Sequence, residues 1–373
     1  MKKNFTLIFL SVVSLVFSQA GAPAAPYYNG FNWTLTGMSL KSALVTKITS
    51  THTNFLTYAD VREACKVTDL DPTDATNTNV FLLYGFSATS CPISTSDDKD
   101  HRTRNKNSFG GGTSCEWNRE HVYAKSLGTP NLVDGATVTS DSDAGEDAHH
   151  IRSSDVERNA DRSNEKFAAG SGNSGDVTVN TWYPGDEWKG DVARMMMYMY
   201  LRYPTQCLPV NVGTGATVAT DTNMIQLFLQ WNAEDPVSQY EDNRNTYHGN
   251  VTNAYAQGNR NPFIDNPYLA TVIWGGPVAE NRWPTVILST TDFASVDNAT
   301  VYPNPTSTNE VYVTTTTEIK SIVLYNINGQ IIQEIKNPTR VNENYKVSDL
   351  PKGFYLMQLA SENASTTKKI IVN

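Results

Sequence analysis

The chain has 373 residues, a length that predicts two domains. Hydrophobic residues make up 39% of it and aromatic residues 10%, enough for a sizeable core, so a wholly disordered chain is excluded. The formal net charge of −9 argues against nucleic-acid binding through bulk charge. Contact with a polyanion such as nucleic acid would need a local basic patch and a metal cation at the phosphate.

The first twenty residues have the pattern of an export signal. Lys2 and Lys3 precede an apolar run over residues 5–17, and small residues follow it. The run is short for a membrane span, so we expect a cleaved signal peptide over residues 1–20 rather than an anchor. Cysteines of an exported chain lie in an oxidising compartment, so two disulfides are expected, with three connectivities open. The four cysteines are Cys65, Cys91, Cys115 and Cys207.

The main region, residues 21–283, has helical patterns with a few strands between them. A helix is expected after Ser39, where leucine and isoleucine recur at helical spacing, and a strand is expected over residues 79–86. Residues 191–203 form the clearest predicted helix; it is apolar nearly all round, which favours a buried helix whose methionines fill the core. The pattern predicts an α+β domain that is mainly helical, followed by a linker over residues 284–298.

Residues 299–373 have a different pattern from the main region. Short alternating apolar runs recur there, separated by turn signals such as Asn328-Gly329 and Pro351-Lys352-Gly353. Five or more short strands with hairpin signals predict a small all-β sandwich.

Two segments, residues 115–126 and 147–167, concentrate the residues that can carry chemistry. In the second segment, Ser154 and Glu157 have the spacing of a capping box, which predicts a helix beginning at Asp155. Short alternating runs before it predict two paired strands. The expected order is therefore strand, loop, strand and helix.

The predicted arrangement puts His121 on the first strand and Asn159 on the helix. Hydrolysis of a phosphodiester needs a base to activate water and a cation to offset charge on the phosphate, and a neutral imidazole is the natural base near pH 7. Carboxylate and amide oxygens suit Mg²⁺ or Ca²⁺. Glu120 and His121 would point to opposite sides of a regular strand, so a shared site requires a strand end or a bulge there.

These residues carry a resemblance to a known family. Asn118-Arg-Glu120-His121-Val, Asp147-x-His149 and Asn159-x-x-Arg162-Ser-Asn164 follow one another in an order similar to that of the endonuclease I family of exported bacterial nucleases. That family carries a His-metal (ββα) finger, and the likeness covers about residues 50–275.

The resemblance implies a secreted endonuclease that cleaves DNA, and RNA as an option, with little sequence specificity. It implies His121 as general base and Glu120 and Asn159 as ligands of one Mg²⁺ ion, or of Ca²⁺ or Mn²⁺ in its place. It also points to Arg152 and Arg162 as catalytic arginines, although residues 122–151 contain no arginine, so the one that contacts the scissile phosphate is left open. Supporting roles fall to Asp147, His149 and Asn164.

The tail resembles a type IX secretion sorting domain. The matching residues include Val301-Tyr-Pro303-Asn304-Pro305 and Leu350-Pro-Lys-Gly353-Phe-Tyr. This resemblance implies a protein that the type IX machinery delivers to the cell surface or the medium. We expect a monomer whose partners are this secretion machinery and a nucleic acid substrate.

Three rival interpretations are open at this point. One is an extracellular ribonuclease with little DNA activity, and another is a non-enzymatic surface-binding protein that reuses the fold. A third is a zinc hydrolase that uses His149 and His150.

The basic run of Arg102, Arg104 and Lys106 can be interpreted as a solvated loop or as a phosphate contact. Trp117 reads equally as a core residue or as a platform for base stacking.

Overall fold

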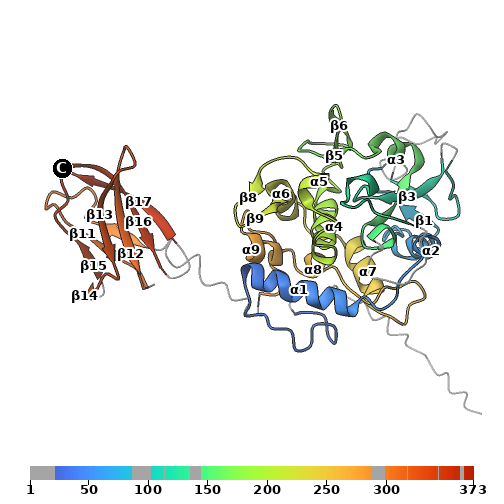
Figure 1. Ribbon diagram of the computed structural model, residues 1–373, viewed down its shortest axis with the longest axis horizontal. Helices are drawn as coiled ribbons and strands as arrows, with labels where there is room; N and C mark the ends of the chain where they lie inside the picture. The colour runs from blue at the N-terminus through green and yellow to red at the C-terminus, as the bar shows by residue number, and fades with distance from the viewer. Residues whose placement is uncertain are drawn as a thin grey trace, which may run out of the picture. The chain divides into compact units, whose positions relative to one another are not determined.

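The computed structural model describes residues 22–85, 102–111, 115–134, 144–284, 286, 299–316, 318–342, 344–361 and 365–373. The chain forms two compact units, Met1–Leu288 and Ser289–Asn373 (Figure 1). The expected signal peptide lies outside the described residues. Within these ranges, no helix combines the length and the apolar character that a membrane crossing requires.

The first unit combines helices with short, separate sheets. Its helices are α1 Gly37–Thr51, α2 Tyr58–Thr68, α3 Val156–Arg162, α4 Lys189–Arg202, α5 Pro209–Val212, α6 Gln226–Glu234, α7 Gln239–His248, α8 Pro262–Asp265 and α9 Tyr268–Trp274. Its strands are β1 Asn79–Phe81, β2 Thr103–Asn105, β3 Trp117–His121, β4 Ile151–Asp155, β5 Lys166–Phe167, β6 Gly175–Thr178, β7 Thr181–Tyr183, β8 Thr217–Val218 and β9 Asp221–Ile225. They pair as β1-β2, β3-β4, β5-β7-β6 and β8-β9.

Helix α4 forms the centre of the main core, with α1, α6 and α8 packed around it (Figure 1). Every residue from Gly190 to Arg202 is buried, and the methionines of this helix are at most 2% exposed. The prediction of a buried helix with methionine as core filler is confirmed. Four tryptophans are also buried in this core: Trp182, Trp188, Trp231 and Trp274.

The first helix begins three residues earlier than predicted. Its N-cap is Thr36, which makes no capping bond through its side chain, so Ser39 lies inside the first turn. The apolar periodicity was nevertheless informative, because the leucines and the isoleucine on that stripe are fully buried. The strand expected over residues 79–86 is shorter, since β1 ends at Phe81.

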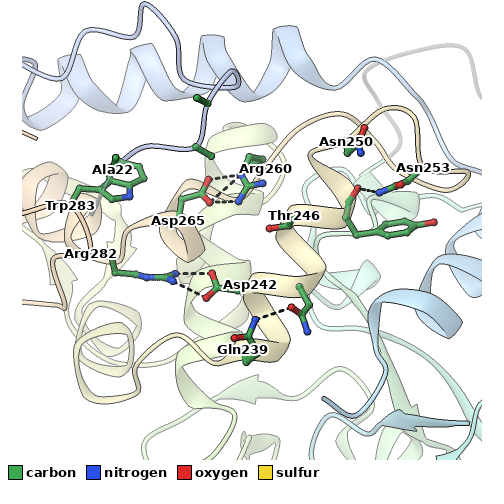
Figure 2. Close-up of a pocket in the computed structure, with 14 residues that line it drawn as sticks. Ala22, Gln239, Asp242, Thr246, Asn250, Asn253, Arg260, Asp265, Arg282 and Trp283 are labelled. Atoms are coloured by element: carbon green, nitrogen blue, oxygen red, sulfur yellow. Dashed lines mark hydrogen bonds and ion pairs between the residues drawn. The ribbon is translucent and has the colours of Figure 1, made fainter. Parts of the chain in front are cut away.

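Two ion pairs join α7 and α8 to residues outside these helices (Figure 2). Arg282 Nη2 lies 2.7 Å from Asp242 Oδ2 on α7, and Arg260 Nη2 lies 2.6 Å from Asp265 Oδ1 at the end of α8. These four side chains help to line a pocket of about 460 Å³. Pairing each guanidinium with a carboxylate compensates much of the cost of removing the charges from water.

The expectation of two disulfides is wrong. Cys65 and Cys207 are buried and carry free thiols, so two of the four cysteines take no part in a disulfide. Cys91 lies outside the described residues.

The strands β3 and β4 pair antiparallel, with Glu120 opposite Arg152 and His121 opposite Ile151. Helix α3 follows β4 directly, so the order strand, loop, strand and helix is as expected. The capping residue differs, however. Asp155 caps α3 by accepting from the backbone N–H groups of Glu157 and Arg158, whereas Ser154 belongs to β4. A carboxylate at the N-cap also suits the positive end of the helix dipole.

The second unit is all-β. Its strands are β10 Thr300–Tyr302, β11 Val311–Thr314, β12 Ser321–Asn326, β13 Ile331–Lys336, β14 Arg340–Val341, β15 Asn344–Val347, β16 Gly353–Ala360 and β17 Ser365–Val372. They form two four-stranded sheets with the orders β10-β11-β15-β14 and β13-β12-β16-β17. One apolar core includes Val313 and Tyr345 from the first sheet and Leu324 and Met357 from the second, as in a sandwich.

Candidate active site

Glu120 lies near the end of β3 with its carboxylate turned toward α3. Its Oε1 accepts from Arg162 Nη1 at 2.9 Å and from the Tyr84 hydroxyl at 3.2 Å. The side chain is almost completely buried. Burial raises the pKa of Glu120 to about 7, although Arg162 and Tyr84 favour the ionised form. A further positive charge near this carboxylate would stabilise its ionised form.

Arg162, the last residue of α3, ties the helix to the end of β3. Besides Glu120, its guanidinium donates to the carbonyl oxygens of His121 at 3.0 Å and Val122 at 2.8 Å. The side chain is fully buried. Both terminal nitrogens therefore bond inside the protein, and the bonds hold Glu120 and the backbone of His121 in place.

Asn159 lies one turn before Arg162 on α3. Its Nδ2 donates to Asn118 Oδ1 at 2.7 Å and to the Arg119 carbonyl at 3.3 Å. These bonds orient the side-chain amide next to the strand residue that precedes Glu120. Because the nitrogen faces β3, the amide oxygen Oδ1 is the atom that can accept from a ligand or bind a cation.

His121 is the last residue of β3, and its neighbours differ from those of Glu120. Its Nε2 lies 2.8 Å from the carbonyl oxygen of Gly145. A carbonyl only accepts, so Nε2 carries the hydrogen and Nδ1 keeps its lone pair. The imidazole is stacked on the Tyr58 ring, with 5.2 Å between centroids and 28° between planes. Burial lowers the pKa of His121 to about 3, so the ring is neutral at pH 7.

The loops that surround His121 approach one another closely. Asp134 Oδ2 lies 4.0 Å from His121 Nε2 and 2.7 Å from Lys125 Nζ. A Cβ atom on Gly145 would overlap the backbone carbonyl of Val133. Glycine at this position therefore lets the loop that carries Asp134 pass over the segment that orients the imidazole.

Asp147 and His149 lie behind this site in a buried polar network. Asp147 Oδ2 accepts from the hydroxyls of Tyr198 at 2.9 Å and Tyr203 at 3.1 Å. Burial alone would raise the pKa of Asp147, but the neighbouring histidines and hydrogen bonds hold it well below its usual range. His149 Nε2 bonds to the carbonyl of Asn259 at 3.1 Å.

His150 bonds separately from His149, through its Nε2 to the carbonyl of Ala144 at 2.7 Å. Burial lowers the pKa of both His149 and His150 to about 4. In the part of the chain that the structure describes, no group of three or more His, Cys, Asp or Glu side chains is arranged to hold a metal ion.

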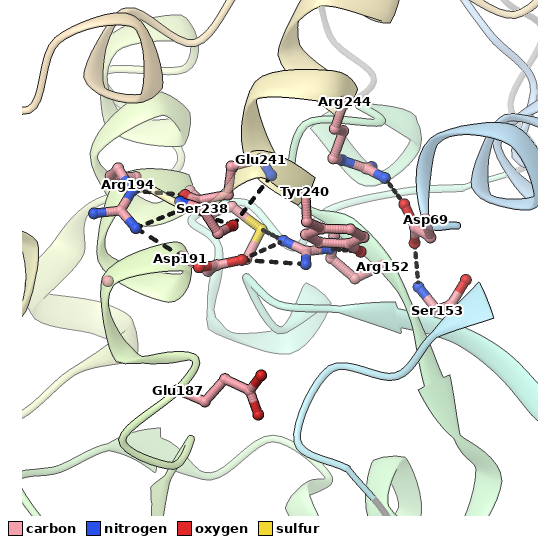
Figure 3. Close-up of polar contacts among 12 residues, drawn as sticks. Asp69, Arg152, Ser153, Glu187, Asp191, Arg194, Ser238, Tyr240, Glu241 and Arg244 are labelled. Carbon is pink, nitrogen blue, oxygen red and sulfur yellow. Dashed lines mark hydrogen bonds and ion pairs between the residues drawn. The ribbon is translucent and has the colours of Figure 1, made fainter. Parts of the chain in front are cut away.

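Arg152 extends from β4 into a buried ion network (Figure 3). Its Nε donates to the Tyr240 hydroxyl at 2.8 Å, and its Nη2 lies 3.3 Å from Asp191 Oδ2. Asp191 also lies 3.6 Å from Arg194, so the network links β4 to α4. Asn164 is exposed and donates to Ser126 Oγ at 3.1 Å. The structure thus groups Glu120, Asn159 and Arg162 around the end of β3 that carries His121; Arg152, Asp147, His149 and Asn164 contact other residues.

Several neighbours of the site carry no signal in the sequence. Tyr84 binds Glu120, and Tyr58 and Gly145 contact the ring of His121, from segments remote in the chain. Of the two interpretations of Trp117, the core one holds, because the side chain is fully buried. The solvated-loop interpretation is wrong for Arg104, which is buried and pairs with the capping residue Asp155.

The first unit belongs to a class of hydrolases that act on phosphodiester bonds, the nucleases. The chain is a member of the Endonuclease I family, whose family model matches residues 36–268. Residues 300–373 match the model of a secretion system C-terminal sorting domain. The interpretation as an endonuclease with a sorting tail is therefore confirmed, and the non-enzymatic alternative is not supported.

Two relatives are similar over most of their length. The chain is 38% identical over 268 residues to an extracellular ribonuclease of Bacillus subtilis (strain 168), and the match covers 68% of this chain and 82% of that protein. It is 39% identical over 247 residues to an extracellular ribonuclease of Bacillus amyloliquefaciens, with 64% and 74% covered. Together with the sorting domain, these relatives identify a protein that is secreted or carried on the cell surface.

Proposed function

We propose that this chain is a metal-dependent endonuclease that hydrolyses DNA, and RNA as well, with little sequence specificity. The observation that carries the proposal is the unit of two strands and a helix, β3, β4 and α3. In it, Glu120 on β3 contacts α3, Asn159 on α3 contacts β3, and His121 is the last residue of β3. This unit supports the ββα arrangement that the family resemblance implies. In domain terms, we propose a signal peptide over residues 1–20, the nuclease over 21–283, a linker over 284–298 and the sorting domain over 299–373.

The residues at the end of β3 fit a hard divalent cation. Glu120 offers a carboxylate whose pKa is raised by burial, and Asn159 offers an amide oxygen while its nitrogen is occupied by β3. Oxygen donors of this kind suit Mg²⁺, and also Ca²⁺ or Mn²⁺, each of which keeps several waters. One such ion, when bound, would offset charge on the scissile phosphate and on the leaving oxygen.

His121 serves as the general base in this proposal. Its neutral imidazole takes a proton from the attacking water at Nδ1, while Nε2–H stays bonded to the Gly145 carbonyl. The imidazolium that forms has the Asp134 carboxylate 4.0 Å from Nε2, which stabilises the positive charge. Tyr58 keeps the ring in one orientation by stacking on it.

Arg162 is a positioning residue in this scheme, because its bonds hold Glu120 and the end of β3. Arg152, Asp147 and His149 would support the site through buried networks, and Asn164 would do so from the surface. We propose that the protein acts as a monomer and that the secretion machinery recognises its C-terminal unit.

The test is plasmid nicking by the mature protein after chelation, with separate add-back of Mg²⁺, Ca²⁺, Mn²⁺ and Zn²⁺. His121→Ala should lower the rate about 10²- to 10⁴-fold while metal affinity stays near that of the parent. Asn159→Ala should weaken the ion instead, so excess Mg²⁺ should recover part of the rate. Asn243→Ala, an exposed asparagine on α7, is the matched control and should have no effect. Loss of metal binding in both His121→Ala and His149→Ala, with recovery by Zn²⁺ alone, would instead support the zinc hydrolase.

The names of both relatives favour one alternative, a ribonuclease with little DNA activity. Parallel gel assays with DNA and RNA of the same sequence separate the two functions. Cleavage of both polymers at comparable rates supports the proposal, and cleavage of RNA alone supports the alternative.

A further inference from the structure

Alternating cations and aromatic rings lead across the surface to the ring of His121. The Arg119 guanidinium lies 3.4 Å from the centroid of the Tyr58 ring, which in turn is stacked on His121. Farther from His121, Arg119 and Arg62 each lie 5.3 Å from the centroid of the Phe109 ring. We call Tyr58, Arg62, Phe109 and Arg119 the cation–aromatic strip.

The strip follows from the spacing of its residues on two elements. Tyr58 and Arg62 are four residues apart on α2, so they share one face of that helix. Arg119 and His121 are two residues apart on β3, so they share one face of that strand. Arg119 joins the two elements by donating to the Tyr58 carbonyl.

Phe109 is held in place from below by Trp117. The two rings meet edge to face, with 4.9 Å between centroids and 73° between planes, and the two residues form an isolated parallel bridge. Trp117 is fully buried, whereas Phe109 is partly exposed. Phe109 is thus an anchored ring that solvent reaches.

One cation of the strip, Arg62, is accessible, and Arg119 is partly buried. The Arg62 side chain is 38% exposed. Its Nε donates to Glu63 Oε1 at 2.7 Å, and Glu63 also bonds Lys66. Among the described residues, the two terminal nitrogens of Arg62 make no bond, so they can donate to a phosphate.

Partly exposed aromatic faces next to guanidinium groups suit one ligand chemistry in particular. Unpaired bases stack on such rings, while the cations bond the phosphates between them. Bases in a duplex are stacked on one another and do not offer their faces. Stacking also provides affinity that depends little on total charge, which matters in a chain with a net charge of −9.

We propose that the cation–aromatic strip binds a single-stranded segment of nucleic acid beside His121, with bases on its rings and phosphates on its guanidinium groups. The inference rests on the proposed function, because it adds a substrate class to the same site. It predicts that the protein holds single strands or locally opened duplex more tightly than closed duplex.

The experiment measures binding without hydrolysis. The full chain carrying Asn159→Ala is titrated in chelator against a labelled DNA strand, an RNA strand of the same sequence and a blunt DNA duplex, with fluorescence anisotropy as the readout. Phe109→Leu removes the ring but keeps an apolar side chain against Trp117, and Arg62→Gln removes one cation. Lys47→Gln is the matched control, because Lys47 is a surface cation 4.6 Å from the Tyr27 ring and has no contact with the strip.

Phe109→Leu should raise the Kd for the single strands about 5- to 150-fold, the effect of losing one base stack, and change the duplex Kd less than about twofold. Comparing the DNA and RNA strands shows whether the sugar contributes. Equal weakening for single strands and duplex, or no weakening beyond that of Lys47→Gln, would overturn the proposal. Plasmid nicking is scored separately, so the failure of hydrolysis and the failure of this binding mode are distinguishable.

Discussion

Replacing Arg162 with methionine removes the cation that compensates the buried charge of Glu120. The guanidinium is fully buried and bonds Glu120 and two backbone carbonyls, those of His121 and Val122. Methionine fills similar space but donates to none of these acceptors, so Glu120 loses its cation and keeps the Tyr84 hydroxyl as a donor. Removing one member of a buried ion pair costs about 3–5 kcal/mol. We expect Arg162→Met to lower the free energy of unfolding of the first unit by that amount.

The measurement is urea unfolding of the full chain followed by tryptophan fluorescence. All seven tryptophans lie between residues 33 and 283, so the signal reports on the first unit alone. The double variant with Glu120→Gln should lose less than the sum of the two single variants, by about 0.5–3 kcal/mol, because no unpaired charge remains. A loss below about 1 kcal/mol for Arg162→Met, or strict additivity, would refute the reasoning that Arg162 acts through Glu120.

Three further outcomes are expected. Burial lowers the pKa of His149 and His150 to about 4, so below pH 6.5 the unfolded chain binds protons that the native state does not. The free energy of unfolding should therefore be at its full value above pH 6.5 and fall by about 3 kcal/mol per histidine as the pH is lowered to 4. Urea unfolding at pH 7 and pH 5 measures this loss. Constant stability over this range would contradict it. Gly145→Ala should displace the carbonyl that orients the His121 ring and lower kcat in a nicking assay. Gly111→Ala, at a position with open space, is the control and should leave kcat unchanged. Equal kcat values for the two variants would contradict a role for the close approach of Gly145 to Val133. Deleting residues 298–373 should leave nicking intact and retain the enzyme inside the cell, as activity assays on cell fractions would test; an inactive or unfolded product would contradict the domain boundary.

Local patterns in the sequence predicted those parts of the fold that depend on neighbouring residues. The apolar stripe of residues 191–203 located α4, because a helix that is apolar nearly all round has to be buried. The alternating runs after residue 299 likewise indicated the all-β unit. Residue types indicated that Glu120 and Asn159 have oxygen donors suited to a hard cation, but their role as metal ligands came from the family resemblance and stays a prediction.

Contacts between distant segments were beyond such patterns. Tyr84 and Tyr58 reach the site from segments far from β3, and no spacing rule connects them to it. The cap of α3 shows the same limit at short range. Ser154 had the spacing of a capping box, but β4 runs one residue farther and its last residue, Asp155, is the cap. The pairing of cysteines, too, depends on distances in space that sequence order does not give.

The enclosed thiols of Cys65 and Cys207 make the timing of folding important during export. Burial raises the pKa of Cys65 to about 12, so almost no thiolate exists in the native protein and the thiol does not react with disulfides. In the unfolded chain the same thiol has an ordinary pKa and is open to oxidants. The Cys65 thiol can therefore be oxidised only until the core has packed around α2. A chain that folds before oxidants reach it carries two reduced cysteines into an oxidising environment and keeps them reduced.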